Sequence, residues 1–198
     1  MVTSNKRQYK ITSEDVQKSI EIIKSEEGFE AKAYPDPFSP LGIELRKAPS
    51  RRQVGWDILR GSPWTIGFGR TGPDVLPGSV TTKDQELFWL SFRVQEELQW
   101  LQKRGVPPCA GLVSLVFNIG KGAFEQSRSY KAFQEGRWED AIEEMQGFNK
   151  AGGKVRPGLV KRRAKEAELV RAWVARQVDE KDPSLRSGSR NFNTEPKA

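Results

Sequence analysis

A chain of 198 residues suits one domain, or one domain with short appendages, and can bury a sizeable core. Its formal net charge of +7 favours an anionic partner: nucleic acid, an anionic membrane face or an acidic cell-wall polymer. The absence of His excludes imidazole acid–base chemistry and most zinc sites, and the single cysteine, Cys109, excludes an internal disulfide. We therefore expect no metal and no cofactor, and interpret Cys109 as a packing residue.

The two ends of the chain differ in composition from its middle. Residues 1–11 are polar and basic, which predicts a flexible arm and not a signal peptide. Residues 179–198 predict a disordered tail, because they are rich in Ser, Arg, Asn and Pro. No apolar run approaches the ~20 residues of a membrane span, so we expect no stable membrane insertion. Residues 12–178 are expected to form one domain, with an insertion at about 37–63.

The first predicted helix covers residues 13–27 and ends in an acid. Thr12 and Asp15 have the spacing of a capping box at its start. One face of this helix is expected to meet the core, and it carries Val16, Ile20, Ile23 and Glu27. Glu27 then stands where a hydrophobic residue is usual, directly before Gly28, a helix terminator.

Glu27 has two interpretations. Partial burial and the negative end of the helix dipole both favour the protonated form of a carboxyl, which is the form that a general acid needs. Alternatively, an arginine holds Glu27 in a structural ion pair without any catalysis.

Two short β segments follow. Residues 31–36 predict a strand, and 64–69 alternate with Trp64, Ile66 and Phe68 on one face, ending at a turn at 71–74. The glycines of the second segment leave room for a close approach to its other face. The Pro-rich, basic stretch at 37–63 between them is either a substrate-contacting lid or a tolerated surface excursion.

The rest of the chain is predicted to be helical, over residues 82–104, 110–119, 127–134, 138–147 and 159–178. In the first of these, leucines and Val94 form the apolar face, and the charges are expected on the solvated face. In the last, the inward residues are predicted to be Val160, Ala164, Ala167, Val170 and Val174. Asn118 is either a helix cap, which its spacing favours, or a ligand-facing amide. The result is an α+β domain, mostly helical, with a small β element after the first helix.

Several motifs, in order over about residues 14–175, resemble those of phage-type lysozymes, glycoside hydrolase family 24. The resemblance begins with Glu27-Gly28, then Tyr34 and Asp36, and then Thr65-Ile66-Gly67-Phe68-Gly69. It continues in Phe117-Asn118-Ile119-Gly120, Phe148–Lys154 and Pro157–Glu166. The family implies a lysozyme-like fold with a small β-sheet lobe and a larger helical lobe.

The resemblance also implies an activity and roles for residues. The activity is hydrolysis of the β-1,4 bond between N-acetylmuramic acid and N-acetylglucosamine in bacterial peptidoglycan. Glu27 would be the general acid, Asp36 would activate water or stabilise an oxocarbenium-like transition state, and Thr65 would help hold that water. Substrate-binding roles would fall to Tyr34, Asn118, Arg162 and Arg163, with Arg162 or Arg163 contacting Glu27.

Three features depart from the family pattern. The segment between Asp36 and Thr65 is much longer than usual, so the strand pairing must persist across the insertion, and Asp57 within it is a less favoured substitute for Asp36. Arg70 stands where the family has His, a difference that we expect to be tolerated. The secretory or anchoring N-terminus of some members is absent, which implies dependence on a holin-like protein and residence in the host cytoplasm until release to the cell wall.

Phage-induced host lysis is the setting that the resemblance implies, with a virion-associated lysin as a second enzymatic setting. A non-catalytic peptidoglycan-binding protein on the same scaffold is the main alternative, although the joint presence of Glu27, Asp36 and Thr65 argues against it. Nucleic-acid binding lacks any supporting motif. We expect a monomer, because the chain has no heptad seam.

Overall fold

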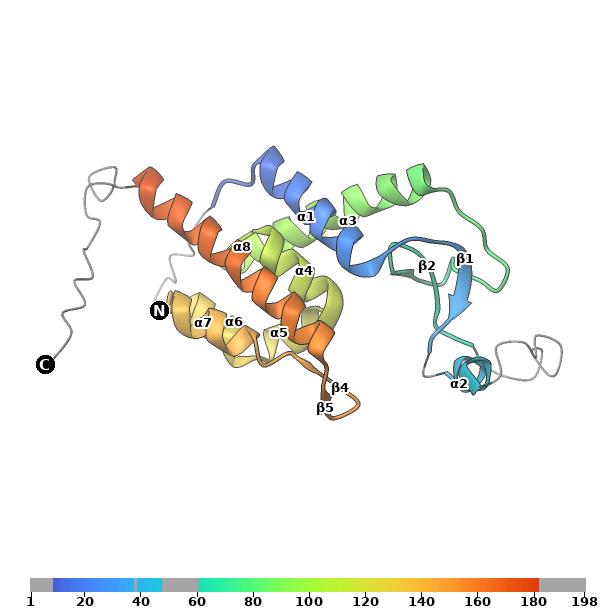
Figure 1. Ribbon diagram of the computed structural model, residues 1–198. Coiled ribbons are helices and arrows are strands. Elements are labelled where there is room, and N and C mark those ends of the chain that lie inside the picture. The colour runs from blue at the N-terminus through green and yellow to red at the C-terminus, as the bar shows by residue number, and fades with distance from the viewer. Residues whose placement is uncertain (1–8, 38, 48–60, 182–198) are drawn as a thin grey trace, which may run out of the picture. The chain divides into compact units, whose positions relative to one another are not determined.

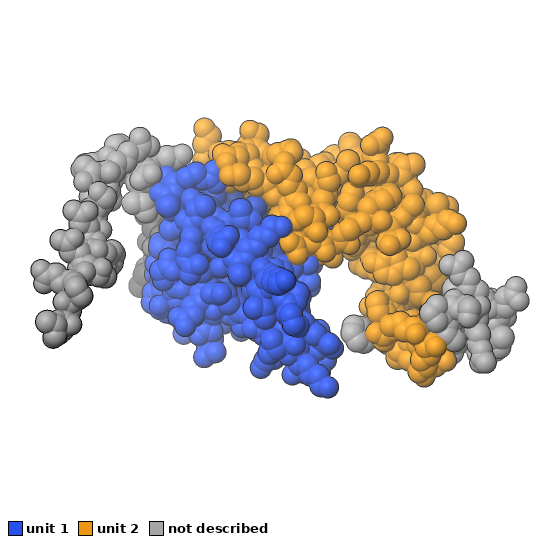
Figure 2. All heavy atoms as spheres, in the orientation of Figure 1, with its two compact units in different colours: residues 1–9, 101–198 blue, residues 10–100 orange. Residues whose placement is uncertain are grey.

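The computed structural model describes residues 9–37, 39–47 and 61–181. Asp57 and the greater part of both predicted terminal segments lie outside these residues. The chain divides into two compact units, residues 10–100 and residues 1–9 with 101–198 (Figure 2). Helices dominate both, with a three-stranded and a two-stranded antiparallel sheet (Figure 1). The predicted α+β class is therefore confirmed.

Helix α1 (Ser13–Glu27) has the predicted bounds and the predicted capping box. The Asp15 backbone N–H donates to the Thr12 hydroxyl, and the Thr12 N–H donates to the Asp15 carboxylate. Gly28 ends the helix with φ +70°, a conformation that glycine adopts without strain. The buried face is centred on Ile22 and Ile23 and includes two polar residues, Asp15 and Ser19, whose hydrogen bonds permit their burial.

The larger sheet joins strands β1 (Glu30–Pro35), β2 (Trp64–Gly67) and β3 (Arg70–Thr71) in that order. The prediction of one strand through residue 69 is wrong, because the chain reverses at Phe68 and Gly69 and pairs β3 with β2. Positive φ angles at Gly67 and Gly69 make this tight reversal possible. Phe68 is buried and packs against Phe29, at a distance of 5.3 Å between ring centroids.

The insertion contains a helix that the sequence analysis missed, α2 (Pro40–Lys47). The Ser39 hydroxyl accepts a hydrogen bond from the Gly42 N–H at 3.0 Å, which makes Ser39 the N-cap and Pro40 the first helical residue. This Ser-Pro pair was a sequence signal for a helix start, obscured by the other prolines around it.

Helix α3 (Lys83–Lys103) follows its predicted apolar face, with Leu90, Val94 and Leu98 fully buried. The prediction that all its charges are solvated is wrong, because Glu86 and Glu97 are buried. Each carboxylate has an arginine partner that compensates its burial: Arg70 for Glu86 and Arg93 for Glu97.

The unit that contains residues 101–198 is built mainly from helices, and α8 packs along both α4 and α7 (Figure 1). Its helices are α4 (Ala110–Ile119), α5 (Lys121–Glu125), α6 (Arg128–Glu135), α7 (Trp138–Met145) and α8 (Pro157–Lys181). As predicted, α4 lies in the core, with Cys109 buried just before it. The short α5 was not predicted, nor was the hairpin of β4 (Lys150–Ala151) and β5 (Lys154–Val155).

The buried face predicted for α8 is confirmed at Ala167 and Val170 but wrong in the first turns of the helix. Val160 and Ala164 are exposed, whereas Arg162, Arg163 and Glu166 are buried in the first half of the helix. The apolar pattern misled because both arginines pair with the carboxylate of Glu166, and this compensation lets the three residues occupy core positions. Helix α8 also continues to Lys181, three residues into the predicted tail.

The predicted N-terminal arm is wrong in its last part. Tyr9 is buried, and its ring meets Trp173 of α8 edge-on with centroids 5.0 Å apart. The Gln102 side-chain amide donates a hydrogen bond to the Tyr9 carbonyl. These contacts order the chain before α1.

Candidate active site

Tyr34 and Thr65 face each other across β1 and β2. Their Cα atoms are register partners, as are those of Pro35 and Trp64. The strand pairing therefore persists despite the insertion at about 37–63. Because Asp36 directly follows this pair, the sheet brings the start of the insertion beside the strand that carries Thr65.

The Tyr34 hydroxyl lies within electrostatic range of two of the candidate catalytic residues, Glu27 and Asp36. Burial raises the pKa of Tyr34, and the negative charges of Glu27, Glu30 and Asp36 raise it further. A hydrogen bond with the Thr65 side chain acts in the opposite direction and lowers it. Three carboxylates thus influence the phenol and the Thr65 side chain bonds it, and three of these four groups are the predicted catalytic residues.

Glu27 occupies the last helical position of α1, as predicted. The residue as a whole is half-buried, and one carboxylate oxygen, Oε1, is shielded from solvent. A carboxyl at the boundary between core and solvent can reach a bound molecule, as a general acid must.

The backbone of Asp36 is fixed on both sides by the insertion. Its N–H donates to the carbonyls of Gly61 (3.1 Å) and Pro63 (2.9 Å). Its carbonyl accepts from the Ser39 N–H (3.0 Å) and from the Ser39 hydroxyl (2.7 Å). Asp36 is thus held by residues from both ends of the insertion.

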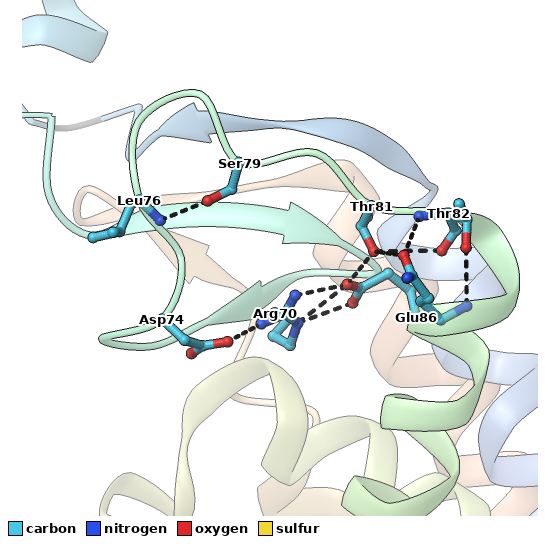
Figure 3. A network of polar contacts seen from close by, with 8 residues as sticks. Arg70, Asp74, Leu76, Ser79, Thr81, Thr82 and Glu86 are labelled. Atoms are coloured by element: carbon cyan, nitrogen blue, oxygen red, sulfur yellow. Dashed lines mark hydrogen bonds and ion pairs between the residues drawn. The ribbon is translucent and has the colours of Figure 1, made fainter.

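Arg70 ties the β2–β3 hairpin to α3 (Figure 3). Its Nη2 lies 2.8 Å from Glu86 Oε1, and its Nε lies 3.1 Å from Oε2. Glu86 Oε1 also accepts a hydrogen bond from the Thr81 hydroxyl at 2.8 Å, and Arg70 Nη1 donates to Asp74. The hydrogen bond to Glu86 is the main reason that the pKa of Arg70 is raised. Arg70 therefore has a structural role at the position where the sequence pattern departs from the family.

Around Glu166, in the unit that contains residues 101–198, lie Asn118, Arg162 and Arg163. Arg163 Nη2 donates to Asn118 Oδ1 (3.2 Å) and to Glu166 Oε1 (2.9 Å). Arg162 Nε donates to the same carboxylate oxygen at 3.1 Å. Burial raises the pKa of the Glu166 carboxyl, and the charge of Arg163 opposes that shift. The favoured interpretation of Asn118 as a cap is wrong, since Gly120 caps α4.

The structure therefore groups the predicted residues into two sets. Glu27, Tyr34, Asp36 and Thr65 meet within residues 10–100, whereas Asn118 and the two arginines meet within the other unit. The contact of Arg162 or Arg163 with Glu27 stays a prediction. Three further residues were not predicted: Ser39, which holds the Asp36 backbone, Glu86, which holds Arg70, and Glu166, which holds both arginines. The i+3 and i+4 spacing of Glu166 from the arginines was a signal that could have identified it.

Other features of the described residues do not add to this site. A surface hollow of about 570 Å³ between α6 and α7 is lined by charged residues, many of which pair with one another, and by none of the candidate catalytic residues. The described part of the chain contains no cluster of three or more Cys, Asp or Glu side chains suited to a metal ion. No helix within it has the length and apolar character needed to cross a membrane.

The family model for phage lysozyme matches residues 24–166, a range that contains every predicted site residue. The chain belongs to the phage lysozyme family. The endolysin of Bacillus phage PZA is 33% identical over 167 residues, which cover 82% of this chain and 57% of that relative. This chain therefore spans less than two thirds of the relative's length.

Two solved structures resemble the fold. The muramidase domain of SpmX from Asticaccaulis excentricus has a TM-score of 0.57 and 26% identity, with 83% of this chain and 98% of that chain covered. The endolysin Lyz of phage P1 has a TM-score of 0.59 and 20% identity, with 80% and 85% covered. The second likeness, at such low identity, concerns the fold alone.

Proposed function

We propose that this member of the phage lysozyme family is a peptidoglycan hydrolase. It cleaves the β-1,4 bond between N-acetylmuramic acid and N-acetylglucosamine, and acts as an endolysin in host cell lysis. The observation that carries the proposal is the pairing of β1 with β2, which sets Tyr34 opposite Thr65 and places Asp36 directly after this pair, with Glu27 within electrostatic range of Tyr34. Glycoside hydrolysis requires two carboxyls in unlike environments, one to give a proton and one to act on water or on the developing cation.

In this mechanism Glu27 protonates the leaving glycosidic oxygen. Its place at the end of α1, half-buried with one oxygen shielded from solvent, suits a group that acts on a bound molecule. Asp36 directs a water molecule or stabilises positive charge at the anomeric carbon, and Thr65 helps to hold that water. Tyr34 connects them, because its hydroxyl bonds Thr65 and lies within the electrostatic influence of both carboxylates.

Digestion of purified cell walls tests the proposal. The wild-type protein is expected to release fragments with new reducing ends at muramic acid, and Glu27→Gln is expected to lower that rate by about 10²–10⁴-fold, the usual contribution of a general acid. Glu21→Gln is the matched control on the same helix, at an exposed residue that bonds only Gln17 among the contacts described. Wall that stays intact but is bound by both proteins would instead mean a non-catalytic wall-binding protein.

Three finer aspects of this function are also proposals. The net charge of +7 favours association with the anionic wall and, together with the family resemblance, supports peptidoglycan as the partner. Passage to the wall is proposed to need a holin-like protein, tested by expressing the chain in a host with and without one. The protein is proposed to act as a monomer, tested by sedimentation at the concentrations used for digestion.

A further inference from the structure

Helix α2, within the insertion, makes its closest backbone approach at Asp36. A Cβ atom added to Gly42 would lie 2.0 Å from the Asp36 carbonyl oxygen and 2.9 Å from the carbonyl carbon. The third nearest atom is the Cα of Pro37, at 3.0 Å. All three are backbone atoms, so no side chain could rotate away to make room. The absence of a side chain at Gly42 is what allows α2 to touch Asp36.

The contact is reinforced by hydrogen bonds through Ser39. The Ser39 hydroxyl donates to the Asp36 carbonyl and accepts from the Gly42 N–H, so it joins Asp36 directly to the first turn of α2. Ser39 is itself buried, which protects both bonds from competition by water. The Asp36 carbonyl therefore has a fixed direction relative to the helix.

The other end of the insertion closes on the same place. A Cβ on Gly61 would lie 2.7 Å from the Trp64 ring, 2.9 Å from Pro35 and 3.0 Å from Leu41. Gly61 also accepts the hydrogen bond of the Asp36 N–H. Leu41 is buried, so α2 is anchored by its own apolar contact as well as through Ser39. Both ends of the insertion thus pack around the end of β1.

We infer that α2 is a positioning element for the reaction: through Gly42 and Ser39 it holds the Asp36 backbone, and hence its carboxylate, at a fixed place beside Tyr34 and Thr65. This inference rests on the proposed function for its catalytic consequence. It gives the insertion a role that differs from both a substrate-contacting lid and a tolerated excursion. Gly42 and Ser39 are positioning residues, since they act through Asp36 and are not assigned any contact with substrate.

Gly42→Ala tests the inference because helix propensity alone predicts a more stable α2 with an unchanged kcat, whereas positioning predicts a lower kcat. Alanine is favoured over glycine inside a helix. Here, however, the added methyl group must move Asp36 by roughly 1 Å to reach an ordinary C···O separation. A misplacement of about 1 Å can cost about 10²-fold in rate. We expect Gly42→Ala to lower kcat on cell-wall glycan by about 10- to 100-fold, with KM within about twofold of wild type.

The matched control is Gly122→Ala in α5, where an added Cβ would meet nothing within 4 Å. It is expected to leave kcat unchanged. Ser39→Ala removes the link without adding volume, and is expected to lower kcat in the same direction by a smaller factor. An unchanged kcat in Gly42→Ala would mean that α2 yields in place of Asp36, and would overturn the inference.

A double variant separates positioning from general destabilisation. If Gly42 acts through Asp36, the double variant of Asp36→Asn and Gly42→Ala has the same kcat as Asp36→Asn alone. If the two substitutions acted independently, their losses of kcat would multiply, and this result would overturn the inference. A wild-type protein that releases no fragments would refute the proposed function instead. The positioning would then be tested by NMR. The chemical shifts of the Asp36 amide and carboxyl groups are expected to change in Gly42→Ala and not in Gly122→Ala. Unchanged Asp36 chemical shifts in Gly42→Ala would overturn the inference.

Discussion

Gly67 of β2 lies directly against the carboxylate of Glu86 on α3. A Cβ atom at Gly67 would stand 2.3 Å from Glu86 Oε2 and 2.4 Å from its Cδ and Cγ. Gly67 also has a φ of +64°, which L-residues with a side chain adopt only at a cost. Because Glu86 is itself held by Arg70 from the other side of the hairpin, one buried carboxylate fixes both β2 and β3 to α3.

Gly67→Ala is therefore expected to lower the free energy of unfolding more than an ordinary glycine substitution. The positive φ alone costs about 1–2 kcal/mol, and displacement of Glu86 adds to it. Gly78→Ala is the matched control, because Gly78 has φ +82° and open space around its Cα. Urea denaturation measures both losses. Equal losses would mean that Glu86 moves aside freely.

Arg70→Gln is expected to destabilise the protein by about 3–5 kcal/mol, because it leaves the Glu86 carboxylate buried without its guanidinium. Arg70→Lys is expected to retain part of the stability, since it keeps the charge and loses the forked geometry. Lys18→Gln breaks an exposed pair with Glu14 in the same unit, and should change stability by no more than about 0.5 kcal/mol. An Arg70→Gln loss as small as that of Lys18→Gln would contradict the assigned role.

The pKa of Tyr34 reports the proximity of Glu27. After burial, the negative charge of Glu27 is the largest cause that raises this pKa. Glu27→Gln removes the charge and is expected to lower the pKa of Tyr34 toward the ordinary tyrosine value, as followed by NMR of ring-labelled tyrosine. Glu21→Gln should leave it unchanged. No change in either variant would place Glu27 outside the electrostatic range of the phenol.

The same shift makes stability depend on alkaline pH. Since the pKa of Tyr34 is higher in the folded state than the value of 10.0 expected when unfolded, the folded state retains the proton longer. Its contribution to stability is fully present below about pH 10 and is lost as the pH rises from there through the folded pKa. Tyr34→Phe is expected to make the decline of unfolding free energy above about pH 10 less steep than in wild type. A slope identical to wild type would contradict the shift.

Glu166→Gln is expected to destabilise the helical unit by about 3–5 kcal/mol. Arg162 and Arg163 are buried, and the substitution leaves their guanidinium groups without the shared carboxylate. Glu168→Gln on the same helix changes an exposed residue and should have little effect on unfolding by urea. Similar urea midpoints for the two variants would show that other groups compensate the buried charges of the two arginines.

Local signals in the chain predicted a large part of the fold. The capping box of Thr12 and Asp15 and the terminating Gly28 defined α1 to the residue, because caps act within a few positions of the helix end. The apolar run at 110–119 likewise predicted a core helix. The α5 helix and the β4–β5 hairpin were missed, since elements of two to five residues contain too little periodicity to distinguish a helix or strand from a loop. The α2 helix was missed because the prolines around it obscured its start.

By itself the sequence determined the family, the α+β class and the residues from which the site is proposed, because each of these depends on residue types at fixed local spacings. Tertiary structure alone decided which charges are buried, that Thr65 meets Tyr34 across the insertion, and that Gly42 touches Asp36. The pairing of Tyr34 with Thr65 joins residues far apart in the chain, and the approach of Gly42 to Asp36 depends on the packing of α2, which no local spacing predicts. In the sequence, a charged residue such as Glu86 or Arg163 resembles a solvated surface residue. Only the folded structure brings the partner that allows its burial.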